Sequence, residues 1–187
     1  NHPAFIRYPR GNGEGVTLKE QPGLIDIGKA EVLKNFSSNG QPKVVFLVLG
    51  PMRAIADEAI AELGADNIDA AVINPRFTKP IDTGTTEFFA QAAEVVVTIE
   101  DHALKGGYGS IVRNHLADTS ITTPVVRIGW PDEFIEHASS VSYLRNKYGL
   151  TGIKTAELIR TTLDRSTCAA TKPNQALGQM DGKSSTL

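Results

Sequence analysis

The sequence predicts a three-layer α/β/α domain, in which helices cover both faces of a mostly parallel sheet of about five strands with one antiparallel edge strand. Apolar runs that suit buried strands alternate along the chain with segments whose apolar residues recur at helical spacing. The 187 residues are 41% hydrophobic and 21% charged, which is enough to bury one full core. We therefore expect one α/β domain with irregular ends.

The order of the expected elements follows from composition and spacing. Residues 28–36 mix apolar and charged side chains and predict a half-exposed edge strand, followed by a turn at residues 37–42. Continuous apolar runs predict buried strands at residues 43–49, 68–73, 95–99 and 125–128. Helical spacing predicts helices at residues 52–63, between Pro51 and Gly64, and at residues 86–93, 108–116, 140–148 and 153–163. This alternation favours a parallel sheet with right-handed crossovers.

Both ends of the chain differ from its centre. Residues 1–23 are the expected interdomain linker, because the prolines and glycines near its start prohibit a regular helix. Residues 24–165 form the expected domain. Residues 166–187 are rich in Thr, Ser, Asn, Gln and Gly without apolar periodicity, and this composition predicts a flexible tail.

Charge and cysteine content exclude several classes of protein. A formal net charge of -2 and no basic cluster beside aromatic residues argue against a nucleic-acid partner. The longest apolar run, residues 44–49, is far too short to span a membrane, so we expect no membrane partner. Cys168 stands alone, which excludes a disulfide framework and a cysteine metal site and fits a cytoplasmic protein.

The segment at residues 95–110 is the first candidate site. Its strand is expected to end at Glu100, Asp101 and His102, and a glycine-rich turn then leads into a helix, which is where open α/β sheets bind ligands. A dinucleotide motif fails, because Val112 stands where its last glycine belongs. Two alternatives stay open: an acid/base or metal cluster, or residues that cap the turn or contact a neighbouring domain. Adjacent residues seldom converge on one atom, which favours the second alternative.

The loop at residues 74–82 is a second candidate. Arg76 and Lys79 stand between two prolines that stiffen the loop, an arrangement that suits a carboxylate or phosphate partner. The alternative is an internal salt bridge, for example to Asp82 or Glu100.

Two further motifs complete the list. Arg7 and Arg10 lie on the proline-stiffened linker, where arginine forks can bind phosphate oxygens bidentately, although spacing alone favours a solvated connector. Trp130 and Phe134 follow the last strand, and we interpret both as packing anchors rather than as a stacking platform.

Five motifs, taken together, resemble the carboxy-terminal portion of the 1-deoxy-D-xylulose-5-phosphate synthases. They are Arg-Tyr-Pro-Arg-Gly at residues 7–11, Ile-Gly-Lys-Ala at 27–30, Asn-Pro-Arg-Phe-Thr-Lys-Pro-Ile-Asp at 74–82, Thr-Ile-Glu-Asp-His-Ala-Leu-Lys-Gly-Gly-Tyr-Gly-Ser at 98–110, and Gly-Trp-Pro-Asp-Glu-Phe-Ile-Glu-His at 129–137. The resemblance covers residues 6–163. Transketolases and 2-oxoacid dehydrogenase β subunits share the strand that ends in acids before glycines, whereas the first and last motifs favour the synthases.

The resemblance implies a transketolase C-terminal-like domain of an enzyme that condenses pyruvate with glyceraldehyde 3-phosphate and releases carbon dioxide, supplying isoprenoid and thiamin precursors. Such enzymes use thiamin diphosphate and Mg²⁺, whose binding motifs lie in two preceding domains. The chain is thus expected to begin within a longer protein, to be inactive alone, and to contain no catalytic, cofactor-binding or metal-binding residue. Its implied partners are the preceding domains, a second subunit of a homodimer and a phosphorylated substrate.

The same resemblance assigns substrate binding to the linker. Arg7 is expected to contribute to binding the phosphate of glyceraldehyde 3-phosphate, with Arg10 as a helper, and no role carries over to Glu100, Asp101 or His102. Two alternatives remain: the C-terminal domain of a transketolase or of a 2-oxoacid dehydrogenase β subunit, and a non-catalytic assembly or anion-binding module that uses Arg7, Arg76 and residues 106–110.

Overall fold

The computed structural model describes residues 3–6, 20–21, 23–37, 42–137 and 139–170. The strands are β1 (Glu31–Lys34), β2 (Lys43–Val48), β3 (Asp69–Asn74), β4 (Val95–Ala103) and β5 (Val125–Trp130). The helices are α1 (Arg53–Leu63), α2 (Thr83–Ala92), α3 (Tyr108–Asp118), α4 (Val141–Tyr148) and α5 (Gly152–Ala170), with a short 3₁₀ turn η1 (Gly64–Asp66) after α1. Strands and helices therefore alternate as the sequence predicts.

One five-stranded sheet carries the domain, in the order β1-β3-β2-β4-β5. β1 runs antiparallel to β3, and the other three pairs are parallel. The predicted mostly parallel sheet with one antiparallel edge strand is thereby confirmed. After β2 the chain crosses to β3 on one side and then returns to β4 on the other, so the strand order reverses between β2 and β4. The carboxyl ends of these two strands form the topological switch point, where such folds bind ligands.

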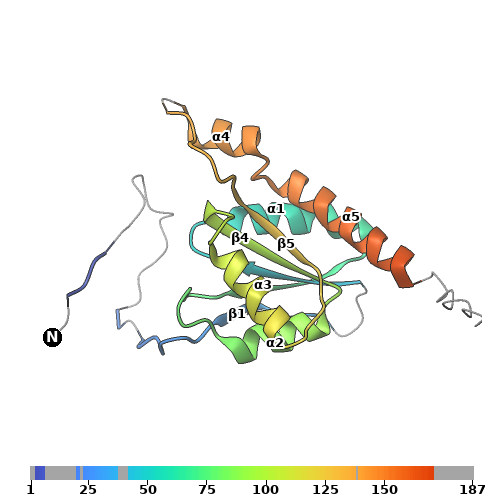
Figure 1. Ribbon diagram of the computed structural model, residues 1–187, viewed down its shortest axis with the longest axis horizontal. Helices are drawn as coiled ribbons and strands as arrows, with labels where there is room; N and C mark the ends of the chain where they lie inside the picture. The colour runs from blue at the N-terminus through green and yellow to red at the C-terminus, as the bar shows by residue number, and fades with distance from the viewer. Residues whose placement is uncertain (1–2, 7–19, 22, 38–41, 138, 171–187) are drawn as a thin grey trace, which may run out of the picture.

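Helices cover both faces of this sheet (Figure 1). On one face Val44 and Phe46 of β2 pack in the same cluster as residues of α1 and α5. On the other face Val45 and Leu47 pack with residues of α2 and α3. Since successive side chains of a strand point to opposite faces, one buried strand serves both clusters. The predicted three-layer α/β/α architecture follows from this continuous apolar run.

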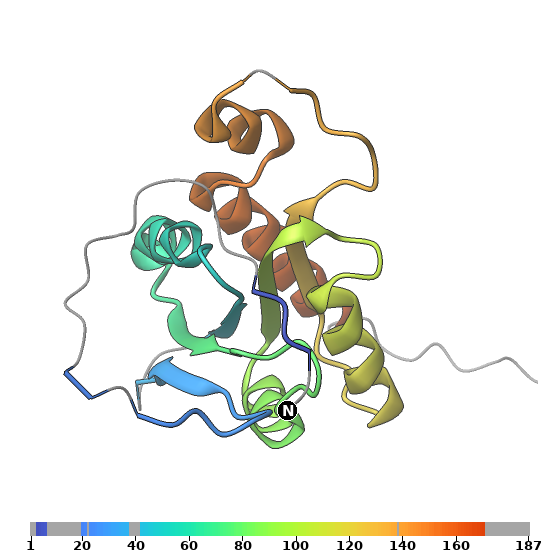
Figure 2. The ribbon, with the colours of Figure 1, turned by 90° about the vertical axis from the view of Figure 1, so that its left-hand side faces the viewer.

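α4 belongs to neither layer. Two perpendicular views place it apart from the sheet, beyond the edge where β4 and β5 end (Figures 1 and 2). None of its residues is buried, and Ser140 caps its start by accepting a hydrogen bond from the backbone N–H of Tyr143 at 3.1 Å.

Three element boundaries differ from the prediction for identifiable reasons. β4 continues beyond Ile99 to Ala103 alongside β5, so Glu100, Asp101 and His102 lie within the strand. α2 begins at Thr83 rather than at residue 86, because the Asp82 side chain accepts from the Thr85 N–H and caps the helix. α5 extends to Ala170, so the helix continues beyond its predicted end at residue 163.

The extension of α5 has a physical cause. A helix anchored by a buried face elongates at little further cost, since each added residue gains a backbone hydrogen bond. Polar side chains on its outer turns bond back to the helix, as Ser166 Oγ does to the Thr162 carbonyl at 3.0 Å. The helix therefore continues to Ala170 although the residues at its end show no apolar periodicity. Residues 171–187 of the predicted tail lie outside the described part of the chain.

The start of α5 generates a prediction about packing. A Cβ atom added at Gly152 would lie 2.6 Å from the backbone nitrogen of Ala59 and closer still to Glu58 on α1. We expect Gly152→Ala to lower the free energy of unfolding by about 1–3 kcal/mol, because the two helices must separate. Urea denaturation of the purified chain measures this.

Gly64→Ala is the matched control for this substitution. Nothing lies within 4 Å of a Cβ at Gly64, and its φ of -59° suits alanine. We expect it to leave stability unchanged or to raise it by about 0.4–1 kcal/mol. Equal losses for the two variants would contradict the close approach of α5 to α1.

Candidate functional site

The buried carboxylate of Glu100 organises the end of β4 beside the switch point. Its side chain is 1% exposed. Oε2 accepts a hydrogen bond from the Tyr108 N–H at 2.6 Å, and Oε1 accepts one from the Gly109 N–H at 2.8 Å. Both amides belong to the first turn of α3, where backbone N–H groups lack intrahelical partners and the helix dipole favours negative charge. Glu100 therefore caps α3 from the neighbouring strand.

The glycines of this segment allow the close contact of strand and helix. A Cβ atom at Gly107 would lie 2.5 Å from the Ala103 carbonyl and would overlap the Glu100 carboxylate. A Cβ at Gly109 would overlap Thr98 Oγ1, which is itself buried in β4. The glycine-rich turn thus serves helix–strand packing. A protein carboxylate occupies the anion position that a phosphate would take at this helix terminus.

The neighbours of Glu100 point elsewhere. Asp101 Oδ1 accepts a hydrogen bond from Trp130 Nε1 at 2.6 Å, and the His102 ring contacts the Ala103 carbonyl through Nδ1 at 3.0 Å while remaining exposed. The three residues that the sequence placed together therefore do not converge. The capping alternative is confirmed for Glu100, and the described residues contain no group of three or more His, Cys, Asp or Glu residues that could hold a metal ion.

Burial also keeps Tyr108 out of acid/base chemistry. Burial of the ring, together with the negative charges of Glu100 and Asp82, raises the pKa of the Tyr108 phenol well above its usual value. The phenol stays neutral throughout the physiological pH range. It packs with the core residues of the α2 and α3 face.

The loop after β5 is built around Trp130. Its ring stands edge-on to Tyr148 of α4, with centroids 5.9 Å apart, and packs against the α1 and α5 cluster. The predicted packing role of Trp130 is confirmed. Phe134 is fully exposed, so its predicted packing role is wrong: the loop runs outward beyond the sheet edge, where no layer covers it.

Glu136 ties this loop to α4. Its carboxylate accepts hydrogen bonds from the ammonium of Lys147 and, at 2.6 Å, from the hydroxyl of Tyr148. These two donors lower the pKa of the Glu136 carboxyl to about 2, the Lys147 contact contributing most. The same contact raises the pKa of Lys147. The resulting pair lies at the surface and positions α4 rather than substrate.

The loop at residues 74–82 fastens the strand that follows the linker. Arg76 pairs with Glu31 of β1, with Nη2 and Oε2 2.8 Å apart. The alternative of an internal salt bridge is therefore confirmed, but the expected partners, Asp82 and Glu100, are wrong, because both carboxylates are occupied by backbone amides. Lys79 is exposed and forms no ion pair with any described residue.

Asp82 provides a second set of contacts between this loop and the chain before β1. Oδ2 accepts from the Ala30 N–H at 3.0 Å and Oδ1 from the Thr85 N–H at 3.1 Å. Partial burial works against the charge, but the two N–H donors, the Thr85 hydroxyl and the charge of Lys29 together lower the pKa of Asp82. Gly28, at a φ of +72°, packs where a Cβ would lie 2.9 Å from Pro80 Cγ. We call these contacts of residues 28–31 with residues 76–82 the linker joint.

The predicted substrate-binding residues, Arg7 and Arg10, lie outside the described residues. Their assignment stays a prediction. What the structure adds is the linker joint, which holds residues 28–31 against the loop after β3.

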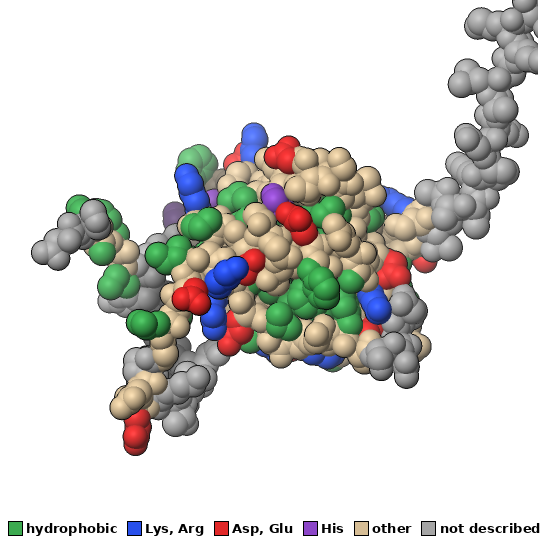
Figure 3. Space-filling view, turned by 90° about the horizontal axis from the view of Figure 1, so that it is seen from below, with side chains coloured by type: hydrophobic (Ala, Val, Ile, Leu, Met, Phe, Trp, Pro, Cys, Tyr) green, Lys and Arg blue, Asp and Glu red, His purple; other side chains and the backbone are tan. Residues whose placement is uncertain are grey.

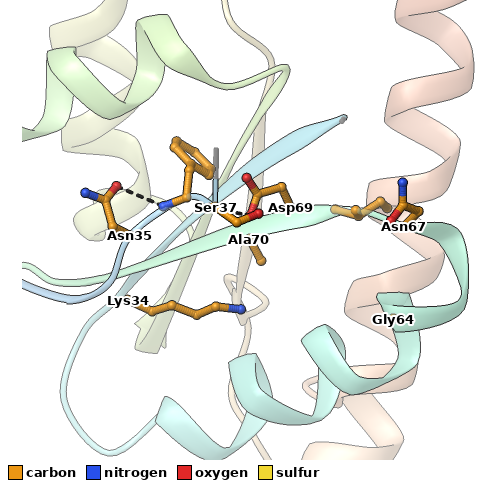
Figure 4. A pocket seen from close by; sticks show the side chains of 9 residues that line it. Lys34, Asn35, Ser37, Gly64, Asn67, Asp69 and Ala70 are labelled. Carbon is orange, nitrogen blue, oxygen red and sulfur yellow. Dashed lines mark hydrogen bonds between the residues drawn. The ribbon is translucent and has the colours of Figure 1, made fainter. Parts of the chain in front are cut away.

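A cavity of about 320 Å³ lies at the opposite end of β3, near the start of the strand. Figure 4 shows Asp69 at its centre, with Oδ1 accepting a hydrogen bond from the Ser37 N–H at 3.0 Å. Its Oδ2 is buried and has no hydrogen-bond partner. Lys34 and Asn35 line the same hollow from the end of β1. The carboxylate fastens the chain after β1 to the start of β3, far from the switch point.

Sequence reasoning missed one feature near the switch point. Arg145 of α4 reaches Met52, which precedes α1, and lines a second cavity between these helices. The two residues are 93 positions apart in the sequence, so no local spacing could have indicated their contact. Asp82, by contrast, had a readable signal, since an aspartate directly before a helix is a common cap.

Comparison with known proteins gives a consistent family. The sequence profile of the transketolase C-terminal domain matches residues 28–153. A 1-deoxy-D-xylulose-5-phosphate synthase of Methylacidiphilum infernorum is 50% identical over 80% of this chain and 23% of its own length. One from Acidobacterium capsulatum is 43% identical over 88% of this chain and 25% of its own length. The chain thus spans about a quarter of the length of these curated relatives.

The fold has a similar counterpart among solved structures. A chain described as split-gene transketolase, inactive β4 tetramer, aligns with a TM-score of 0.66 and 34% identity, over 75% of this chain and 44% of that chain.

Among the described residues, no helix is long and apolar enough to cross a membrane.

The buried cap generates a prediction about stability. Glu100→Gln keeps the shape of the side chain but removes its charge and turns an N–H donor toward one of the two amides. We expect the free energy of unfolding to fall by about 2–3 kcal/mol, the usual range for losing a hydrogen bond to a charged group. Chemical denaturation measures the loss.

The adjacent Asp101→Asn is the control. Its carbonyl can still accept from Trp130 and the site is exposed, so a change below about 0.5 kcal/mol is expected. A Glu100→Gln variant as stable as Asp101→Asn would show that the carboxylate does not hold α3.

The Glu136 pair predicts a pH dependence. Because folding lowers the pKa of Glu136 to about 2, the carboxylate contributes stability above its unfolded pKa of about 4.3. That contribution decreases as the pH falls through the folded pKa. We expect the stability difference between the parent chain and Glu136→Gln to be constant above about pH 5 and to vanish toward pH 2, and unfolding curves across this range measure it.

The exposed Glu133→Gln variant, three positions away in the same loop, is the control and should differ little from the parent at any of these pH values. A difference for Glu136→Gln that persists unchanged at pH 2 would exclude an ionic contribution.

Proposed function

Since the chain belongs to the transketolase C-terminal domain family, we propose that it is the carboxy-terminal domain of a 1-deoxy-D-xylulose-5-phosphate synthase. The observation that carries this proposal is the identity of 43–50% to curated synthases over most of the chain. The split-gene transketolase, at 34% identity, supports the shared fold but gives weaker support to a transketolase activity.

The proposed reaction joins pyruvate, after loss of carbon dioxide, to glyceraldehyde 3-phosphate. Thiamin diphosphate would supply the carbanion chemistry and Mg²⁺ would bind its diphosphate. The described residues do not provide a site that fits thiamin diphosphate or Mg²⁺. The carboxylate nearest the switch point, Glu100, is sealed under α3, and Asp101 and His102 diverge from it. We therefore assign the binding of thiamin diphosphate and Mg²⁺ to the rest of the parent enzyme, and we assign no catalytic residue to this chain.

We assign the domain a positioning role, exerted through the linker joint. Arg76 holds β1 by its ion pair with Glu31, and Asp82 holds the residue before β1 by a backbone hydrogen bond. The same contacts determine the direction in which the preceding linker leaves the domain. In the proposed enzyme this linker presents Arg7, with Arg10 as a helper, to the phosphate of glyceraldehyde 3-phosphate. A guanidinium fork matches the phosphate oxygens bidentately.

Exposed apolar side chains support the proposed partners. Five gather along the segment that leads into and through β1: Leu24, Ile25, Ile27, Val32 and Leu33. Figure 3 shows further hydrophobic side chains on the face beside α2, where Phe88 is 64% exposed. Surfaces of this kind mark contacts with other protein. They support association with the preceding domains and with a second subunit of a homodimer, and the neighbouring transketolase chain is itself described as an assembly. A cytoplasmic location, consistent with the lone cysteine, completes the proposal.

Steady-state kinetics of the full-length enzyme test the assignment of the linker. Arg7→Ala should raise the KM for glyceraldehyde 3-phosphate about 10–100-fold, because one charge-assisted phosphate contact is lost. The KM for pyruvate should change little. Arg113→Ala, an exposed arginine on α3, is the control and should leave both values unchanged.

The 187-residue chain alone should show no turnover of these substrates, in keeping with the inactive assembly described for the structural neighbour. Turnover by the isolated chain, or an Arg7→Ala enzyme with an unchanged KM for glyceraldehyde 3-phosphate, would refute the assignment.

A further inference from the structure

A cavity of about 500 Å³ lies between α1 and α4. Figure 1 shows these two helices in the upper part of the domain and β1 in its lower part. Its walls are apolar where Ile55 and Leu150 contribute, and both of these residues are buried. Two charged side chains also line it, Glu58 from α1 and Arg145 from α4. This volume accommodates a small organic molecule.

Among the described residues, the guanidinium of Arg145 has no carboxylate counter-ion. Its Nε is shielded from solvent and has no hydrogen-bond partner, and its Nη2 donates only to the thioether of Met52 at 3.3 Å. Among the described residues no carboxylate oxygen lies within 4.0 Å of its guanidinium. Three other arginines of the domain each pair with a carboxylate at 2.7–2.8 Å: Arg53 with Asp57, Arg76 with Glu31 and Arg160 with Asp66.

An incompletely paired, partly buried guanidinium is unfavourable in the empty protein. An anion in the cavity would remove that penalty, so the site is poised for a negatively charged group. Glu58 limits the charge of that group. Its carboxylate accepts from the Gly152 N–H at 2.9 Å and lines the same cavity, where it would repel a dianion such as phosphate.

We propose that the cavity between α1 and α4 binds a small monocarboxylate with an apolar body, the carboxylate on Arg145 and the body against Ile55 and Leu150. This site shares no residue with the linker motif and does not depend on the proposed synthase activity. Ala54 and Ile55 of the first turn of α1 line the cavity, so a bound molecule would contact the start of this helix.

Titration of the isotopically labelled 187-residue chain with 4-methylpentanoate, followed by NMR, tests the site. We expect saturable shifts of the backbone amides of Ala54, Ser142 and Asn146, with a Kd on the order of millimolar for so small a ligand. The neutral analogue 4-methylpentan-1-ol and inorganic phosphate should each bind at least tenfold more weakly.

Variants separate the guanidinium from general apolar binding. Arg145→Gln should weaken 4-methylpentanoate binding at least tenfold, Arg145→Lys should retain part of it, and Arg113→Gln on α3 should retain all of it. The amide spectrum of each variant reports its folding, so Arg145→Lys preserves the test if Arg145→Gln does not fold. The proposal is overturned by absence of saturation, by equal binding of the alcohol or phosphate, or by unchanged affinity after loss of the Arg145 charge.

Discussion

The contact between the Glu100 carboxylate and the first turn of α3 constrains the whole carboxyl edge of the sheet. Because the charge is almost fully buried, it must be satisfied within the protein, and the two free amides of α3 satisfy it. That requirement brings α3 against β4 so closely that only glycine fits at positions 107 and 109. It also removes from solvent the acidic side chain nearest the switch point. The position of α3 and the glycine content of this segment therefore have one common cause.

A second constraint acts on the edge strand β1, at one side of the sheet. β1 is short and antiparallel, and one edge strand of this kind holds its place weakly without help. The linker joint supplies that help through Arg76 and Asp82, both from the loop after β3. Asp82 has a double function, since the same carboxylate caps α2 and binds the N–H of Ala30. The backbone position of Ala30, directly before β1, is thereby coupled to the position of helix α2.

The sequence correctly predicted the features that depend on the local spacing of apolar residues. The buried strands, the helix order, the antiparallel edge strand and the anchoring role of Trp130 all follow from apolar spacing and are confirmed. The errors arise where distant residues decide the outcome. β4 extends past its apolar run because β5 pairs with it, Arg76 selects Glu31 because β1 lies beside its loop, and Phe134 is exposed because no layer lies above it. The cavity at Arg145 joins helices too distant in sequence for any motif to indicate it.

The Glu100 contact and the linker joint also affect which groups of the domain can bind a ligand. Ligands of open α/β folds usually occupy the switch point, using helix termini and polar side chains. Here the chain fills that position itself, with Glu100 on the α3 terminus and Trp130 packed against Tyr148. The Glu100 carboxylate is buried, with both oxygens hydrogen-bonded to α3, so a substrate or metal has no access to it. The guanidinium of Arg145 has no such internal partner among the described residues, and its positive charge is the sign that a carboxylate ligand requires.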